Sequence, residues 1–176
     1  MSNSNNIDLK LLRAFSELLT SKGIEQITVS DIAKQAQLSR RVFYNYYNSK
    51  EDFLRESILI ILDEITKILN TDLLFEYSVL QSVLEFLYSN QEIIQPFVIH
   101  FPDIKRIVKN YIKEMVVNSD IPNLSEQLEE AYHIPYYYAL DIYVLTVASI
   151  IFNWINNNFK EPPEEIARFI DRVTRI

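Results

Sequence analysis

The chain lacks cysteine altogether and contains a single glycine, Gly23, among its 176 residues. Without cysteine it has no disulfide framework, thiolate metal site or cysteine nucleophile, a composition that fits a reducing cytosol. Phosphate-binding loops, dinucleotide-binding turns and nucleophile elbows all need glycine where the backbone bends sharply. The sequence therefore predicts none of these sites, and the scarcity of glycine beside abundant Leu, Ile, Glu and Lys favours helices.

Signals for export, membrane insertion and catalysis are also missing. The first ten residues, MSNSNNIDLK, show no basic segment followed by an apolar core, so no signal peptide is expected. The most apolar stretch, 142–155, is shorter than the roughly 18 apolar residues that a span needs, which favours a buried helix in a cytoplasmic protein without membrane contact. The two histidines, His100 and His133, lack paired metal-ligand spacing. We expect no metal, no cofactor and no enzymatic activity.

The charges are unevenly distributed along the chain. Residues 1–55 contain 8 basic and 6 acidic side chains, a net charge of +2. Residues 56–176 contain 9 basic and 18 acidic side chains, a net charge of −9. A mildly basic N-terminal part on an acidic remainder is typical of a DNA-binding domain joined to a domain with another role.

The spacing of apolar residues in the N-terminal third predicts two substantial helices. The first covers about 8–22, and Gly23 is expected to end it in a left-handed conformation. A longer helix is expected to start after Ser49, which can cap it, and its apolar stripe repeats over four turns between Leu54 and Leu69.

Between these two helices the sequence predicts a pair of short ones. Thr28 can cap a helix over 29–35, with Asp31 three residues later in a weaker form of the capping box. Ser39 can cap a second short helix over 40–46. Two short helices joined by about four residues are typical of a helix-turn-helix, the DNA-binding motif whose second helix enters the major groove.

The rest of the chain also predicts helices, separated by prolines that include Pro96. The expected ranges are 74–89, 91–100, 103–118, 124–133, 136–157 and 163–175. Residues 139–155 are apolar almost all round, which predicts burial on more than one face, including a face against a second subunit. The last helix is expected to bury its apolar side chains, Ile166, Phe169, Ile170 and Val173.

The run from Leu11 to Leu54 resembles the DNA-binding domain of the tetracycline-repressor (TetR/AcrR) family. The resemblance lies in the segments LLRAFSELLTSKGIEQITVSDIAKQAQLS and RRVFYNYYNSKEDFL. Gln37 stands where the family usually has a glycine in the turn. The resemblance implies an all-α protein. A three-helix helix-turn-helix domain (1–50) would be joined by a long helix to a helical domain for dimerisation and effector binding (51–176).

The resemblance and side-chain chemistry together select seven candidate contacts to double-stranded DNA. The resemblance implies that Tyr44 and Lys50 contact the DNA backbone, and that Thr28 lies at a phosphate-facing helix N-terminus. The resemblance also implies that Arg40, Arg41, Asn45 and Tyr46 occupy the base-proximal positions. Arginine can bridge guanine and asparagine can pair with adenine, whereas tyrosine hydroxyls usually anchor phosphates. Tyr47 is expected to point inward.

Several functions remain compatible with the sequence. The leading hypothesis is a homodimeric repressor that binds a palindromic operator, dimerises through helices 136–157 and 163–175, and is released by a small apolar effector. An alternative is a TetR-like co-regulator whose C-terminal domain docks a partner protein. A third is an interaction module with an inactive DNA-binding head, which the set Arg41, Tyr44 and Lys50 argues against.

Overall fold

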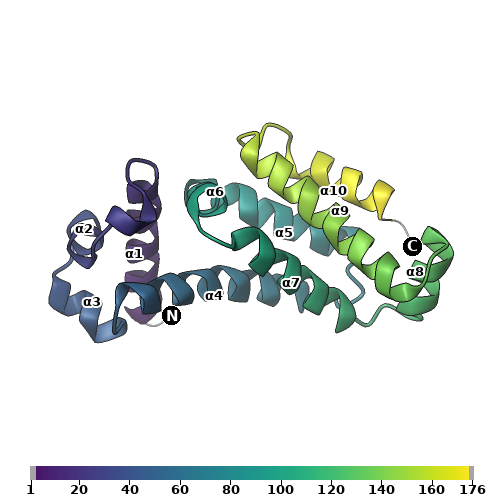
Figure 1. The fold of residues 1–176 in the computed structure, drawn as a ribbon, viewed down its shortest axis with the longest axis horizontal. Coiled ribbons are helices and arrows are strands. Elements are labelled where there is room, and N and C mark those ends of the chain that lie inside the picture. The colour runs from purple at the N-terminus through teal and green to yellow at the C-terminus, as the bar shows by residue number, and fades with distance from the viewer. Residues whose placement is uncertain (1–2, 175–176) are drawn as a thin grey trace. The chain divides into compact units, whose positions relative to one another are not determined.

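The structure is a computed structural model that describes the backbone of residues 3–174 and the side chains of residues 6–174. Within this part of the chain it contains ten α-helices, one short 3-10 helix and no strand, which confirms the predicted all-α class. The chain divides into two compact units (Figure 1). The N-terminal unit comprises Met1–Thr66 and Asn90–Pro102, and the C-terminal unit comprises Lys67–Ser89 and Asp103–Ile176.

The N-terminal unit contains the predicted helix-turn-helix. Its elements are α1 (Asn3–Leu19), η1 (Ile24–Gln26), α2 (Val29–Gln35), α3 (Arg40–Tyr46), most of α4 (Lys50–Leu69) and α6 (Gln91–His100). The bounds of α2, α3 and α6 coincide with the predicted ranges. Ser39 and Ser49 cap α3 and α4 as expected, because their hydroxyls accept hydrogen bonds from the amides of Val42 and Asp52.

Aromatic side chains make up much of the core of the N-terminal unit. Phe53 of α4 lies edge-on to Phe15, Phe43 and Tyr47, with ring centroids 5.1–5.6 Å apart. Phe97 of α6 makes the same kind of contact with Phe15 at 5.5 Å. Each such pair contributes about 0.5–1.5 kcal/mol beyond the burial of its apolar area. Helix α3 is therefore held firmly on its inner side.

The C-terminal unit is built around α9. Its elements are α5 (Tyr77–Ser89), α7 (Ile104–Val117), α8 (Leu124–Tyr132), α9 (Tyr136–Asn156) and α10 (Pro163–Val173). Trp154 of α9 is buried, and its Nε1–H donates to the carbonyl of Glu161 at 2.8 Å, which fixes the turn before α10. Among the described residues, α9 is also long and apolar enough to suit a membrane span, a property that core helices share.

The backbone conformation of Gly23 differs from expectation, whereas Gln37 occupies the turn position expected for it. The prediction that Gly23 ends α1 in a left-handed conformation was wrong, because its φ and ψ are −62° and 146° and α1 already ends at Leu19. Gln37 instead adopts the left-handed conformation, with φ at 56°, in the turn between α2 and α3. The lone glycine therefore lies where none is required, and a glutamine occupies a turn that suits glycine.

Two further expectations need correction. Pro96 does not separate helices but lies buried inside α6, where it cannot donate to the carbonyl of Glu92. In α10, Ile166 and Ile170 are buried as expected, whereas Phe169 and Val173 are exposed. Helix α10 packs on α5 and α9 through one side only, so its apolar stripe is wider than the surface that covers it.

The compact units also differ from a simple division at residue 50. Most of α4 and the whole of α6 belong to the N-terminal unit, because Phe53, Ile93 and Phe97 pack into the same core as α1 and α3. The division into a DNA-binding domain (1–50) and an effector domain (51–176) concerns function, and it stays a prediction.

Candidate nucleic-acid interface

Helix α3 has two chemically distinct faces. Its inner face carries Phe43, which is fully buried, and the chain continues into the buried Tyr47 as expected. The tyrosine hydroxyl donates to Asp8 Oδ1 at 2.6 Å, and burial raises the pKa of Tyr47. The outer face carries five candidate contacts, all of them exposed: Arg40, Arg41, Tyr44, Asn45 and Tyr46. The structure thus exposes the predicted base-proximal residues and Tyr44 on one short helix, where Tyr46 also lines the acidic groove described below.

The turn before α3 is closed by backbone hydrogen bonds. The amide of Gln37 donates to the carbonyl of Lys34 at 3.0 Å, and the amide of Leu38 donates to the carbonyl of Ala33 at 2.8 Å. This pattern requires a left-handed residue at position 37, which explains the positive φ of Gln37. The angle between α2 and α3 is therefore set by a specific turn and not by a loose loop.

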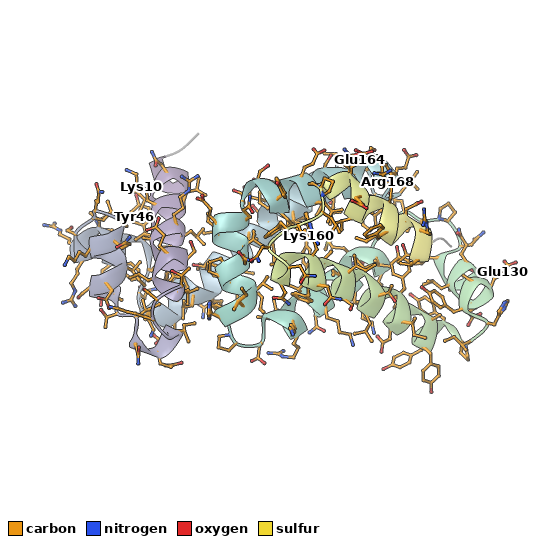
Figure 2. The ribbon with its side chains drawn as sticks, turned by 90° about the horizontal axis from the view of Figure 1, so that it is seen from above. Lys10, Tyr46, Glu130, Lys160, Glu164 and Arg168 are labelled. Carbon is orange, nitrogen blue, oxygen red and sulfur yellow. The ribbon has the colours of Figure 1, made fainter. Side chains whose placement is uncertain are left out.

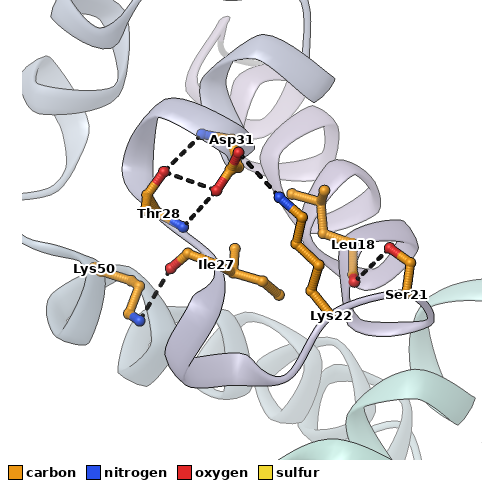
Figure 3. A network of polar contacts seen from close by, with 7 residues as sticks. All are labelled: Leu18, Ser21, Lys22, Ile27, Thr28, Asp31 and Lys50. Carbon is orange, nitrogen blue, oxygen red and sulfur yellow. Dashed lines mark hydrogen bonds and ion pairs between the residues drawn. The ribbon is translucent and has the colours of Figure 1, made fainter.

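Thr28 caps α2 through a complete capping box (Figure 3). Its hydroxyl accepts from the amide of Asp31 at 3.1 Å, while its amide and hydroxyl both donate to Asp31 Oδ2 at 2.9 and 2.8 Å. The hydrogen bonds from Thr28 and Lys22 lower the pKa of Asp31 to about 2. Thr28 is exposed, but its hydroxyl proton is already used within the protein.

Lys50, the first residue of α4, also has partners inside the protein (Figure 3). Its Nζ donates to the carbonyls of Ile24 and Ile27, each at 3.1 Å. The side chain is half-buried. Sequence reasoning selected Lys50 as a DNA contact and missed these bonds, because nothing in the spacing of residues 24–50 indicates which carbonyls a lysine will reach.

An acidic groove lies beside the end of α3. It has a volume of about 420 Å³ and is lined by Asp8, Tyr46, Tyr47, Asp52, Glu56 and Ile60. Three carboxylates at this position disfavour the approach of DNA phosphates. The groove therefore limits the candidate DNA-binding surface on this side of α3.

The described residues contain no cluster of three potential metal ligands.

The C-terminal unit exposes a second surface of different chemistry. Every exposed position of α9 is uncharged, and α10, which packs on α9, also exposes large apolar side chains. We call this the α9–α10 surface and define it by Tyr138, Ile142, Leu145, Phe169 and Val173. Another part of α10 carries charges, including Glu164 and Arg168, which pair at 3.9 Å (Figure 2).

The sequence matches known families over most of its length. Residues 11–57 match the family described as bacterial regulatory proteins, tetR family, and residues 77–175 match a transcriptional regulator C-terminal region. The chain therefore belongs to the tetR family of bacterial transcriptional regulators. It is a DNA-binding regulator and not an enzyme.

Individual relatives extend this comparison. The transcriptional activator DhaS of the dhaKLM operon, from Lactococcus lactis subsp. lactis (strain IL1403), is 41% identical over 44 residues, which are 25% of this chain and 24% of that protein.

Two solved structures share the fold. A dihydroxyacetone kinase operon activator DhaS has a TM-score of 0.64 and 17% identity, with 96% of this chain and 93% of that chain covered. The fatty acid degradation regulator FadR from Bacillus halodurans has a TM-score of 0.65 and 19% identity, with 96% and 94% covered.

Proposed function

We propose that this protein binds a palindromic operator in the cytoplasm as a symmetric homodimer, with α3 of each subunit in the major groove. The observation that carries this proposal is the outer face of α3. Five adjacent exposed side chains of DNA-binding chemistry lie on a helix whose inner side is fixed by Phe43 and Tyr47. A rigid helix with exposed donors is what direct readout of base edges requires.

The candidate contacts divide into two roles. Residues near the start of a recognition helix reach base edges, so Arg41 is assigned to a guanine and Asn45, one turn later, to an adenine. Arg40 and Tyr46 flank them as base-proximal residues. Backbone phosphates are assigned to Tyr44, to the helix N-terminus at Thr28 and to Lys50, which position the helix without reading the sequence. At Thr28 the assignment concerns the N-terminus of α2, because the amide and hydroxyl of Thr28 already donate to Asp31.

The α9–α10 surface is the proposed dimer interface. Leu145 is 49% exposed and Tyr138 61% exposed, although both belong to the most apolar helix of the chain. Large apolar side chains gathered on one uncharged surface mark interaction sites. A two-fold axis through the α9–α10 surface would place this surface of one subunit against the same surface of the second subunit. The same two-fold symmetry matches that of a palindromic operator.

The sign of regulation admits two candidates. In the first, a small apolar effector bound in the C-terminal unit favours the state that does not bind DNA and so releases a repressor. In the second, the protein is a co-regulator or activator whose C-terminal unit docks a partner protein. The activator DhaS supports activation by analogy, and the high exposure of Tyr137 beside Tyr138 supports a docking surface.

Selection of bound sequences from a random duplex pool tests the proposal. We expect a palindrome with half-sites about one helical turn apart, and titration at two salt concentrations should show a steep salt dependence. Arg41→Ala should relax the preference at one or two base pairs per half-site, at a cost of about 1–3 kcal/mol. Arg168→Ala, an exposed arginine of α10, is the control. Recovery of no preferred sequence would overturn operator binding.

A further inference from the structure

Lys50 connects two parts of the N-terminal unit that are distant in sequence. Its ammonium donates to carbonyls 26 and 23 residues earlier, those of Ile24 and Ile27, at 3.1 Å each. An ammonium group has three N–H donors, so these two bonds use most of its capacity. Hydrogen bonds from a charged donor are stronger than neutral ones. The geometry thus gives Lys50 a structural task in addition to its charge.

The two carbonyls belong to the first residue of the three-residue helix η1 and to the residue that follows it, and the first hydrogen bond of this turn runs from the amide of Gln26 to the carbonyl of Gly23 at 2.9 Å. The carbonyl of Ile24 also accepts from the amide of Ile27, at a long 3.4 Å, which closes the three-residue helix η1. Short 3-10 turns have poor hydrogen-bond geometry and need support from elsewhere. Ile27 is itself 1% exposed and is followed directly by Thr28, the cap of α2. The position of η1 therefore determines where α2 begins.

A second lysine holds the same segment by a different chemistry. Lys22 Nζ pairs with Asp31 Oδ1 at 3.3 Å, and the Asp31 carboxylate in turn receives the amide and hydroxyl of Thr28 (Figure 3). This network is exposed and lies within α2 and the chain that precedes it. Lys50, by contrast, comes from α4. Among these contacts, only the Lys50 bonds fix the start of α2 to another helix.

We propose that Lys50 is a positioning residue for DNA binding, whose hydrogen bonds to Ile24 and Ile27 set α2 and the turn to α3 against the first turn of α4. Its influence on operator affinity acts mainly through this bracing, and a phosphate contact by its remaining N–H is secondary. The proposal rests on the proposed role of α3 in operator binding. A recognition helix has to be held close to its productive position, so a loosened α2 weakens every contact that α3 makes.

The test is Lys50→Met in the full-length protein, because methionine keeps a long apolar side chain and removes all three donors. Lys34→Met is the matched control, since it removes one positive charge from an exposed position of α2. Two readouts are needed: hydrogen exchange of the amides of Gln26, Ile27 and Thr28, and operator affinity over a range of salt concentrations. We expect Lys50→Met to accelerate exchange at these amides at least tenfold and to lower affinity about tenfold, with a salt slope that changes by much less than the loss of a full phosphate contact in each subunit would require. Lys34→Met should leave the exchange of these amides unchanged.

A direct phosphate contact gives a different pattern. Loss of one contact in each subunit would flatten the slope of log affinity against log salt by about 2 per dimer. That result, with exchange equal to wild type, would overturn the proposal. Lys50→Arg, which retains charged donors, should recover part of the exchange protection, and failure to recover any would also count against it. If wild-type protein selects no operator, the proposed function fails, whereas the exchange measurement still tests the bracing itself.

Discussion

The outer faces of α3 and α9 are both exposed, yet their side chains differ in chemistry, and we propose opposite kinds of partner for them. On α3 the exposed residues are arginine, asparagine and tyrosine, and the inner side is locked by aromatic contacts. On α9 every exposed residue is uncharged, and the neighbouring α10 also exposes apolar side chains. Charged donors suit a polyanion, whereas uncharged apolar side chains suit another protein surface. Exposure alone therefore says little about a helix, and the chemistry of the exposed face is what supports the two different roles proposed for α3 and α9.

The largest effect is expected from a charge placed on the α9–α10 surface, which tests whether this surface is the dimer interface. Leu145→Glu should raise the dimer Kd by more than about 100-fold, because two carboxylates would meet near a two-fold axis at a cost of several kcal/mol. Operator affinity should fall with it, since a monomer holds only one half-site. Sedimentation at several protein concentrations measures the dimer, and duplex titration measures the affinity.

The chain offers a closely matched control for that substitution. Leu59 of α4 is 50% exposed, almost the same fraction as Leu145, but it lies in the N-terminal unit. Leu59→Glu should leave the dimer intact. A dimer that survives Leu145→Glu, or one that is lost equally in both variants, would show that the interface lies elsewhere.

A smaller effect is expected in the turn that sets the direction of α3. Gln37→Gly should stabilise the protein by about 0.5–1 kcal/mol, because glycine adopts a left-handed conformation without the steric cost of a side chain. Gly23→Ala should also stabilise it, by about 0.4–1 kcal/mol, since alanine tolerates this backbone conformation and its Cβ meets no atom within 4 Å. Thermal unfolding of both variants is the measurement. A lower Tm in either one contradicts the conformational argument for that position.

The smallest effect concerns the exposed capping network of α2. The pKa of Asp31 is lowered to about 2 in the folded protein, so its contribution to stability is present above the unfolded pKa of about 4. This contribution should disappear as the pH falls from about 4 to 2, because the unfolded chain binds a proton more readily. Asp31→Asn should remove this part of the acid dependence. Unfolding by denaturant at pH 5, 4 and 3 provides the check, and parallel pH profiles for both proteins would contradict it.

Local structure was largely predictable from the sequence. The bounds of α2, α3 and α6 and the caps at Thr28, Ser39 and Ser49 followed from helical periodicity and from hydroxyl residues placed before helices. The inward position of Tyr47 and the exposed position of Arg41 followed from the same periodicity. These features depend on residues within about one turn of each other, so the information that determines them is contiguous in the chain.

Long-range partners were decided only by the tertiary structure. Periodicity shows that α6 has an apolar side, but packing places Phe97 against Phe15 and so joins α6 to the N-terminal unit. In the same way, the sequence shows that α4 starts with a positively charged lysine, but it does not show which groups this lysine contacts. The fold brings its ammonium group to the carbonyls of Ile24 and Ile27. The prediction that Phe169 is buried was wrong, because the width of an apolar stripe does not reveal how much of it the neighbouring helices cover. The sequence thus determined which segments are helices and which side chains of α3 are exposed, and the packing of distant segments decided what each helix touches.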